Sequence, residues 1–121
     1  NKVTHKDLEV WKLSIGFVTN VYKACKQLPD SEKFGLISQM QRAAVSIPTN
    51  IAEGAARKNT KEYIQFLYIA LGSSSEVDTL IQIAKNIYGI DMEDLEYTNT
   101  QISKMLVGLI KSLKSKLIPN P

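Results

Sequence analysis

Apolar residues recur along this chain at alternating steps of three and four positions, which is the spacing of one face of an α-helix. Four segments carry the pattern, and they cover about residues 4–28, 34–57, 60–88 and 91–117. No stretch shows the sustained apolar–polar alternation that indicates a strand. Because the connections are short, consecutive helices should run antiparallel. The pattern predicts an all-α protein, with residues 1–121 forming a single antiparallel up-down-up-down four-helix bundle.

The ends of these segments carry helix-capping signals. Thr4, with Asp7 three residues later, is a near-match to a capping box at the start of the first helix. Thr60 is the expected N-cap of the third helix, and Gly89 is expected to end it. Asp91 is expected to cap the fourth helix. These signals set the predicted helix boundaries.

The first and third segments each carry two adjacent apolar stripes. On the first segment one stripe comprises Leu8, Trp11, Ile15, Val18, Tyr22 and Cys25, and the other comprises Val10, Phe17, Val21, Ala24 and Leu28. On the third segment the core stripe comprises Ile64, Leu67, Leu71, Val77, Ile81 and Ala84, and its neighbour comprises Phe66, Ile69, Leu80, Ile83 and Ile87. A single four-helix bundle does not cover both stripes of a helix. The apolar surface left uncovered predicts assembly into a homo-oligomer.

The second segment separates a core face from a polar stripe. Its predicted core residues are Leu36, Met40, Ala43, Ile47 and Ile51, and Pro48 is expected to bend the helix without breaking it. The polar stripe comprises Gln39, Arg42, Ser46, Asn50, Glu53 and Arg57. A solvated face is usually rich in Lys and Glu, whereas this stripe mixes amides, a hydroxyl, one acid and two arginines.

The stripe's charged residues need partners. Arg42 and Glu53 are about 16 Å apart along a helix axis and do not reach each other. Their partners are therefore expected on another helix, another subunit or a ligand. The composition favours a polar network or a subunit interface, which Glu76 of the third segment would join. A solvated face and direct ligand binding are the alternatives.

The residue types leave little material for catalysis. The single histidine, His5, and the single cysteine, Cys25, exclude a disulfide framework, a cysteine-rich zinc site and a two-histidine metal site. Residues 72–75 lack the glycine and lysine of a phosphate loop. We predict a protein that is not an enzyme and has no cofactor. Its apolar runs are too short to span a membrane, and the absence of a secretory segment predicts a cytoplasmic location.

The charge is mildly basic: 15 Lys and Arg against 12 Asp and Glu give a net charge of +3. This permits a polyanionic partner such as RNA or DNA. Arg42, Arg57, Lys58 and Lys61 are the candidate phosphate contacts, and three of them cluster at the joint between the second and third segments, beside the amides of a helix N-terminus. No aromatic residue is interleaved with them in the sequence, which predicts contacts without base stacking or sequence reading.

The basic turn around Lys111, Lys114 and Lys116 is the second candidate for nucleic-acid contact. The fourth segment opens with acids and closes with these lysines, an order that a helix dipole favours by itself. Structural stabilisation therefore competes with a functional interpretation of these lysines.

Part of the second segment resembles the signature of a known family. The similarity is to the motif of bacterial four-helix-bundle proteins, which are encoded in intervening sequences of 23S ribosomal RNA genes or elsewhere in the chromosome. The matching positions are residues 34–36, Gln39, residues 42–48, residues 50–54 and Arg57. The signature lies in the second segment, and the resemblance as a whole extends over nearly the whole chain. Residues 55–56, two alanines, depart from the larger or glycine-containing pair that is common in the family.

This resemblance implies a ring-like homopentamer. A relative, the accessory protein of diversity-generating retroelements, is a basic pentameric barrel that binds nucleic acid and a reverse transcriptase. Two functions follow as expectations. One is a nucleic-acid-associated oligomeric module, and the other is a structural or adaptor ring that binds a protein partner and no nucleic acid.

Overall fold

The computed structural model describes residues 4–117, which form four α-helices and, over that range, no strand. The helices are α1 (Glu9–Ala24), α2 (Leu36–Ala55), α3 (Thr60–Tyr88) and α4 (Glu93–Ser115). Short 3-10 turns occupy His5–Asp7, Cys25–Gln27 and Asp30–Glu32. The predicted all-α fold with four helices is confirmed. Residues 1–3 and 118–121, the ends of the predicted domain, lie outside the described range.

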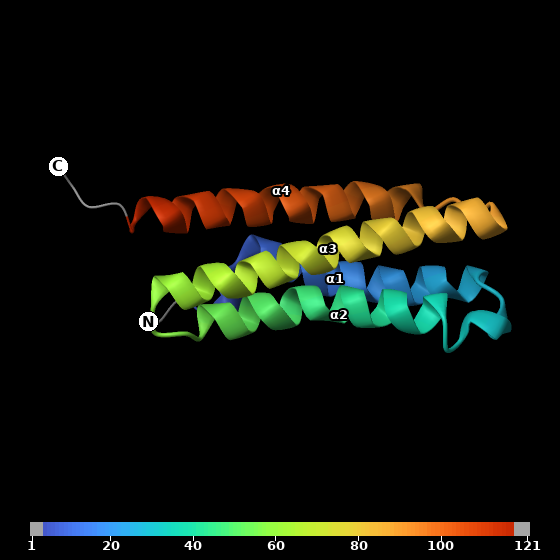
Figure 1. The fold of residues 1–121 in the computed structure, drawn as a ribbon, viewed down its shortest axis with the longest axis horizontal. Coiled ribbons are helices and arrows are strands. Elements are labelled where there is room, and N and C mark those ends of the chain that lie inside the picture. The colour runs from blue at the N-terminus through green and yellow to red at the C-terminus, as the bar shows by residue number, and fades with distance from the viewer. Residues whose placement is uncertain (1–3, 118–121) are drawn as a thin grey trace.

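The four helices lie lengthwise beside one another, and the colour in Figure 1 advances in opposite directions along consecutive helices. The main packing joins α1 to α2, α2 to α3, α3 to α4 and α4 to α1, so α1 and α3 occupy diagonal positions. The joint between α2 and α3 lies at the same end of the molecule as the C-terminal end of α4 (Figure 1). None of the helices within residues 4–117 is long and apolar enough to cross a membrane.

The first helix begins later than predicted. Thr4 and Asp7 form the expected capping box, in which the Thr4 amide donates to Asp7 Oδ2 at 2.9 Å. The box closes only the 3-10 turn His5–Asp7, because Leu8 is extended and α1 starts at Glu9. A capping box binds the first backbone amides of a 3-10 turn in the same way as those of an α-helix. The capping signal in the sequence therefore could not distinguish a 3-10 turn from the start of α1.

The other predicted boundaries are close to those observed. Asn59, rather than Thr60, is the N-cap of α3, and its Oδ1 accepts a hydrogen bond from the Glu62 amide at 2.8 Å. Gly89 ends α3 with a φ of 65°, as predicted. Asp91 Oδ1 accepts from the Glu93 amide, and α4 begins at Glu93. The second helix begins at Leu36, two residues after the predicted start.

The core confirms the predicted face of α2, whose five residues are all buried, and α2 continues through the buried Pro48. On α1 the second stripe is in the core, where Val10, Phe17 and Val21 are buried. The first stripe is only partly covered: Cys25 is buried, whereas Ile15 and Tyr22 are 42% and 45% exposed. On α3 the neighbouring stripe is also partly covered: Leu80 is buried, whereas Ile69, Ile83 and Ile87 are exposed, with Ile87 at 61%. One chain therefore leaves apolar stripes partly uncovered on two diagonal helices.

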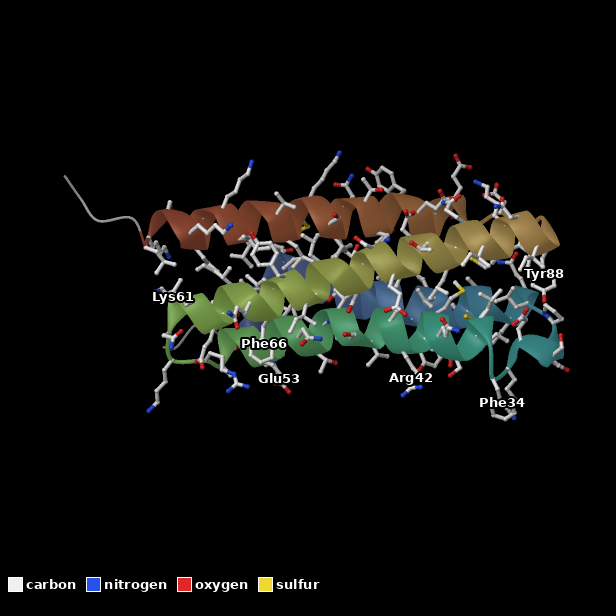
Figure 2. The ribbon with its side chains drawn as sticks, in the orientation of Figure 1. Phe34, Arg42, Glu53, Lys61, Phe66 and Tyr88 are labelled. Carbon is white, nitrogen blue, oxygen red and sulfur yellow. The ribbon has the colours of Figure 1, made fainter. Side chains whose placement is uncertain are left out.

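The acidic turn before α2, Asp30–Glu32, is hydrogen-bonded to the C-terminal end of α3. The Glu32 carboxylate accepts hydrogen bonds from the Tyr88 hydroxyl and from the Leu36 amide. These two bonds, the Tyr88 bond foremost, stabilise the charged carboxylate and lower the pKa of Glu32. Figure 2 shows Tyr88 at this end, with Phe34 projecting from the turn.

A buried polar pair joins α3 to α4. Asn99 Oδ1 accepts from the Ser74 hydroxyl at 2.7 Å, and Asn99 Nδ2 donates to the Ser74 carbonyl at 2.9 Å. Both residues are almost fully buried. Because such a pair is satisfied only in one alignment, it fixes how far α4 is shifted along α3.

Replacing Asn99 by alanine tests this role. We expect Asn99→Ala to lower the free energy of unfolding by about 1–3 kcal/mol, because the Ser74 hydroxyl loses its partner in a dry environment. Denaturant unfolding followed by circular dichroism measures the change. The adjacent, exposed Thr100→Ala is the control and should stay within about 0.5 kcal/mol of the wild type. Equal losses in the two variants would contradict a specific role for the pair.

Candidate functional site

Helices α2 and α3 approach each other closely at Gly54. A Cβ atom built on Gly54 would lie 2.8 Å from Phe66 Cβ, 2.9 Å from Tyr63 Cδ1 and 3.2 Å from the Tyr63 carbonyl oxygen. Two of these atoms belong to, or are bonded directly to, the α3 backbone, so they have little freedom to move away. Only glycine permits this crossing.

Arg57 lies against the ring of Phe66 beside this crossing. Its guanidinium carbon is 4.7 Å from the Phe66 ring centroid, a cation–π geometry. Its Nη2 is also 3.6 Å from Glu53 Oε2. Figure 2 shows Glu53 and Phe66 on the two neighbouring helices. The crossing, the ion pair and the stacked arginine thus form one local unit, which we call the arginine platform (Glu53, Gly54, Arg57 and Phe66).

The arginine platform corrects two predictions. Glu53 pairs with Arg57, four residues later in the same stripe, and does not require a partner from another helix, a subunit or a ligand. The i, i+4 spacing in the sequence was the signal that could have found this pair. An aromatic ring does lie beside the basic joint, because the α2–α3 turn brings Phe66 back under Arg57.

Lys58 and Lys61 complete the joint. Both are exposed, and within residues 4–117 neither forms an ion pair. The adjacent N-terminus of α3 has fewer free backbone amides for a phosphate than the sequence suggested, because Asn59 already accepts the hydrogen bond of the Glu62 amide. The side-chain cations, rather than the backbone amides, supply most of the positive charge here.

The second predicted basic group lies at the same end of the molecule. Lys114 of α4 donates a hydrogen bond to the Tyr68 hydroxyl of α3 at 2.6 Å, and its ammonium lies 5.1 Å from the Tyr68 ring centroid. Lys111 and Lys116 are exposed on the same turns. Figure 1 places this end of α4 at the same end of the bundle as the α2–α3 joint. The two groups that the sequence offered as alternatives therefore share one basic end of the bundle.

The remaining polar stripe lies along the seam between α2 and α3. Ser46 Oγ accepts hydrogen bonds from Asn50 Nδ2 at 2.9 Å and from the Ser73 hydroxyl at 2.8 Å. A shallow pocket of about 350 Å³ is lined by Gln39, Arg42, Ala43, Ser46, Ser73 and Glu76. Within the described range Arg42 and Glu76 form no ion pair.

The stripe therefore divides into separate parts. Arg42 lies about 22 Å from Arg57 along the helix axis, too far to belong to the basic end. Ser46 and Asn50 are half-buried and hydrogen-bonded, whereas Gln39, Arg42, Glu53 and Glu76 are exposed in the single chain. Within the single chain Glu53 and Glu76 are thus not buried, and their place in a subunit interface stays a prediction.

Packing accounts for the remaining candidate groups. His5 lies edge-on to the Trp11 ring with centroids 5.1 Å apart. Cys25 is buried, and burial raises the pKa of its thiol. No cluster of three or more His, Cys, Asp or Glu that could hold a metal ion occurs among residues 4–117.

Comparison with known proteins places this geometry in context. The sequence model described as "23S rRNA-intervening sequence protein" matches residues 6–110. Among solved structures, the chain is similar to a protein of unknown function from the S23 ribosomal protein family of Bacteroides thetaiotaomicron. The two are 28% identical with a TM-score of 0.74, over 84% of this chain and 95% of that chain. No curated protein matches the sequence. The family match includes the whole α2–α3 crossing and its joint.

The crossing at Gly54 can be tested by adding one methyl group. We expect Gly54→Ala to lower the free energy of unfolding by about 1–3 kcal/mol, because the new Cβ overlaps atoms of Phe66 and Tyr63. Gly72→Ala is the control, since nothing lies within 4 Å of its added Cβ. That substitution should raise stability by up to about 1 kcal/mol through helix propensity. Thermal or urea unfolding measures both, and changes of the same sign would contradict the close crossing.

Proposed function

The chain belongs to the 23S rRNA-intervening sequence protein family, and on this basis we propose that it is an oligomeric helical-bundle module that binds nucleic acid without catalysis. The observation that carries this proposal is the meeting of two basic groups at one end of the bundle. They comprise Arg57, Lys58, Lys61, Lys111, Lys114 and Lys116. Lysine and arginine side chains neutralise phosphates irrespective of base sequence.

The distribution of acidic residues supports this assignment. From residue 97 to residue 117 the chain holds four lysines and no Asp or Glu. The acids of α4, Glu93, Asp94 and Glu96, all lie in its first turn, at the opposite end of the bundle. A polyanion is therefore attracted to one end and repelled by part of the other.

The two uncovered apolar stripes support self-association. The stripe of α1 includes Ile15 and Tyr22, and that of α3 includes Ile69 and Ile87, all exposed. Because the stripes differ and lie on diagonal helices, the α1 stripe of one copy packs on the α3 stripe of the next. Contacts between unlike surfaces generate rings when the rotation closes. The antiparallel bundle would thus form a ring, and the family resemblance sets its number at five.

Assembly would multiply the basic ends. Five copies of a chain with a net charge of +3 would carry about +15, and several weak phosphate contacts would act on one nucleic-acid molecule. Ring formation therefore converts a mildly basic chain into a polyvalent binder.

One observation favours a second function, a ring that binds a protein partner. Phe34 is 89% exposed. A separate groove of about 740 Å³ lies between the end of α1 and the start of α2, and its lining includes Tyr22, Leu28 and Ile37. Exposed apolar surface of this kind marks protein contacts. An adaptor of this kind would bind its protein partner without nucleic acid.

The heterologous contact predicts how two variants behave when mixed. Ile15→Lys damages only the α1 stripe and Ile69→Lys only the α3 stripe, so each variant alone should be a monomer. The mixture should form dimers, because one intact pair of stripes remains, and should stop there. Light scattering measures the masses.

Val107→Lys is the matched control, since Val107 is exposed on α4 outside both stripes. This variant should assemble like the wild type. A wild-type mass of 13.5 kDa, that of one chain, at micromolar concentration would contradict self-association. Monomers in the mixture would contradict the pairing of α1 with α3.

Removal of the joint cations tests nucleic-acid binding. Replacing Arg57, Lys58 and Lys61 with glutamine should keep the helical content and weaken binding equally for all sequences. The salt dependence should flatten by up to about one unit per lost contact per subunit. Titrations of RNA and DNA at several salt concentrations measure both effects.

The control removes three cations from the opposite end. Replacing Lys23, Lys26 and Lys33 with glutamine changes the net charge equally but should affect affinity and salt slope less. Equal effects of the two triple variants would show that net charge alone matters. Binding that the joint variant leaves unchanged would transfer the contact to the lysines of α4. Absence of wild-type binding at low salt would contradict this function and favour the adaptor.

A further inference from the structure

We propose that Arg57, which lies over the ring of Phe66, is a stacking platform for an unpaired base, so that the basic end binds single-stranded nucleic acid in preference to duplex. This inference rests on the proposed nucleic-acid binding and specifies its substrate class. It concerns the arginine platform, whose geometry is defined by three independent contacts.

The first contact places the arginine. The Arg57 guanidinium carbon is 4.7 Å from the Phe66 centroid, so one side of the cation faces the ring. The Arg57 side chain nevertheless keeps 44% of its surface accessible. The ring covers the side of the cation that it faces, and the accessible part of the side chain is open to solvent. A planar cation with an aromatic ring beneath it and solvent above it is a surface on which a base can stack.

The second contact holds the arginine in place. Glu53 Oε2 is 3.6 Å from Arg57 Nη2, and this ion pair favours the position of the Arg57 side chain over the ring. Part of the arginine's charge is thereby balanced. Arg57 is consequently better suited to stacking than to a strong phosphate contact, whereas Lys58 and Lys61 are exposed and available for phosphates.

The third contact holds the ring. A Cβ added at Gly54 would lie 2.8 Å from Phe66 Cβ, so the Phe66 side chain leaves α3 at a close approach of α2 and α3. A platform on two packed helices loses little conformational freedom when a base binds. Stacking of this kind requires no hydrogen-bond readout and tolerates any base.

These contacts discriminate between strands and duplexes. In a duplex each internal base is covered on both faces by its neighbours, so it cannot stack on Arg57 without being extruded. In a single strand the bases are available, and each base stacked on a protein group contributes a factor of about 5–150 in affinity. Lys58 and Lys61 contact the phosphates of both forms. The lysines therefore supply general binding, and the arginine platform supplies the preference.

The test compares a labelled oligo(dT) strand of about 16 nucleotides with its duplex, by fluorescence anisotropy at one low salt concentration. The wild type should bind the strand at least about fivefold more tightly than the duplex. Arg57→Lys retains the charge but removes the planar cation. It should lower affinity for the strand to the level for the duplex and leave duplex binding and the salt slope unchanged.

Two further variants separate the roles. Phe66→Leu should remove the same preference because the ring is lost. Lys58→Gln should weaken strand and duplex binding by the same factor. Circular dichroism and sizing confirm that each variant is folded and assembled, and Arg57→Lys decides the outcome if Phe66→Leu is unstable.

The outcomes also separate this inference from the function on which it rests. Binding of neither probe by the wild type would overturn both. Equal binding of strand and duplex would overturn the platform while leaving nucleic-acid binding intact. A strand preference that survives Arg57→Lys would show that the preference arises elsewhere, for example at Tyr68 beside Lys114.

Discussion

The close crossing of α2 and α3 at Gly54 is the contact on which the candidate site depends. The missing side chain of Gly54 lets the α3 backbone approach α2, and the same approach brings Phe66 under Arg57. Glu53, the residue before this glycine, then pairs with the arginine. A bulkier residue at the crossing would move both helices apart. One steric constraint thus explains three residues of the sequence signature by their contacts with one another.

The apolar stripes present a second constraint, which concerns the relation between the single chain and its assembly. In α1 the side chains of Val10 and Phe17 fill the core, and Ile15 and Tyr22 of the other stripe face outward. Burying that stripe inside the same bundle would require rotating α1 and exposing Phe17. In the proposed assembly, packing these outer residues against another molecule would bury apolar surface that the single chain leaves exposed. Because α1 and α3 occupy diagonal positions, the two exposed apolar surfaces would let successive copies pack side by side. A single exposed apolar patch would instead favour a dimer.

Periodicity predicted the number and placement of the helices because core burial imposes a repeat of 3.6 residues on each of them. Which of two stripes on α1 faces the core was not readable, because both have the same period. The contact of Arg57 with Phe66 was equally hidden, since it depends on how the turn after α2 directs α3. The pair of Glu53 and Arg57 was readable from its spacing. Local rules thus predicted the elements, whereas contacts between elements required the structure.

The positions of the basic residues also bear on whether the basic end serves stability or binding. Lysines at the C-terminal end of α4 interact favourably with the helix dipole, which accounts for their presence without a ligand. Lys61 is different, because it lies in the first turn of α3, where the dipole is positive and an acid would be preferred. A cation there costs on the order of 0.3–1 kcal/mol. Lys61 also lies near Arg57 and Lys58, which repel it further. Local stability does not account for this concentration of positive charge, whereas a bound polyanion would offset both costs.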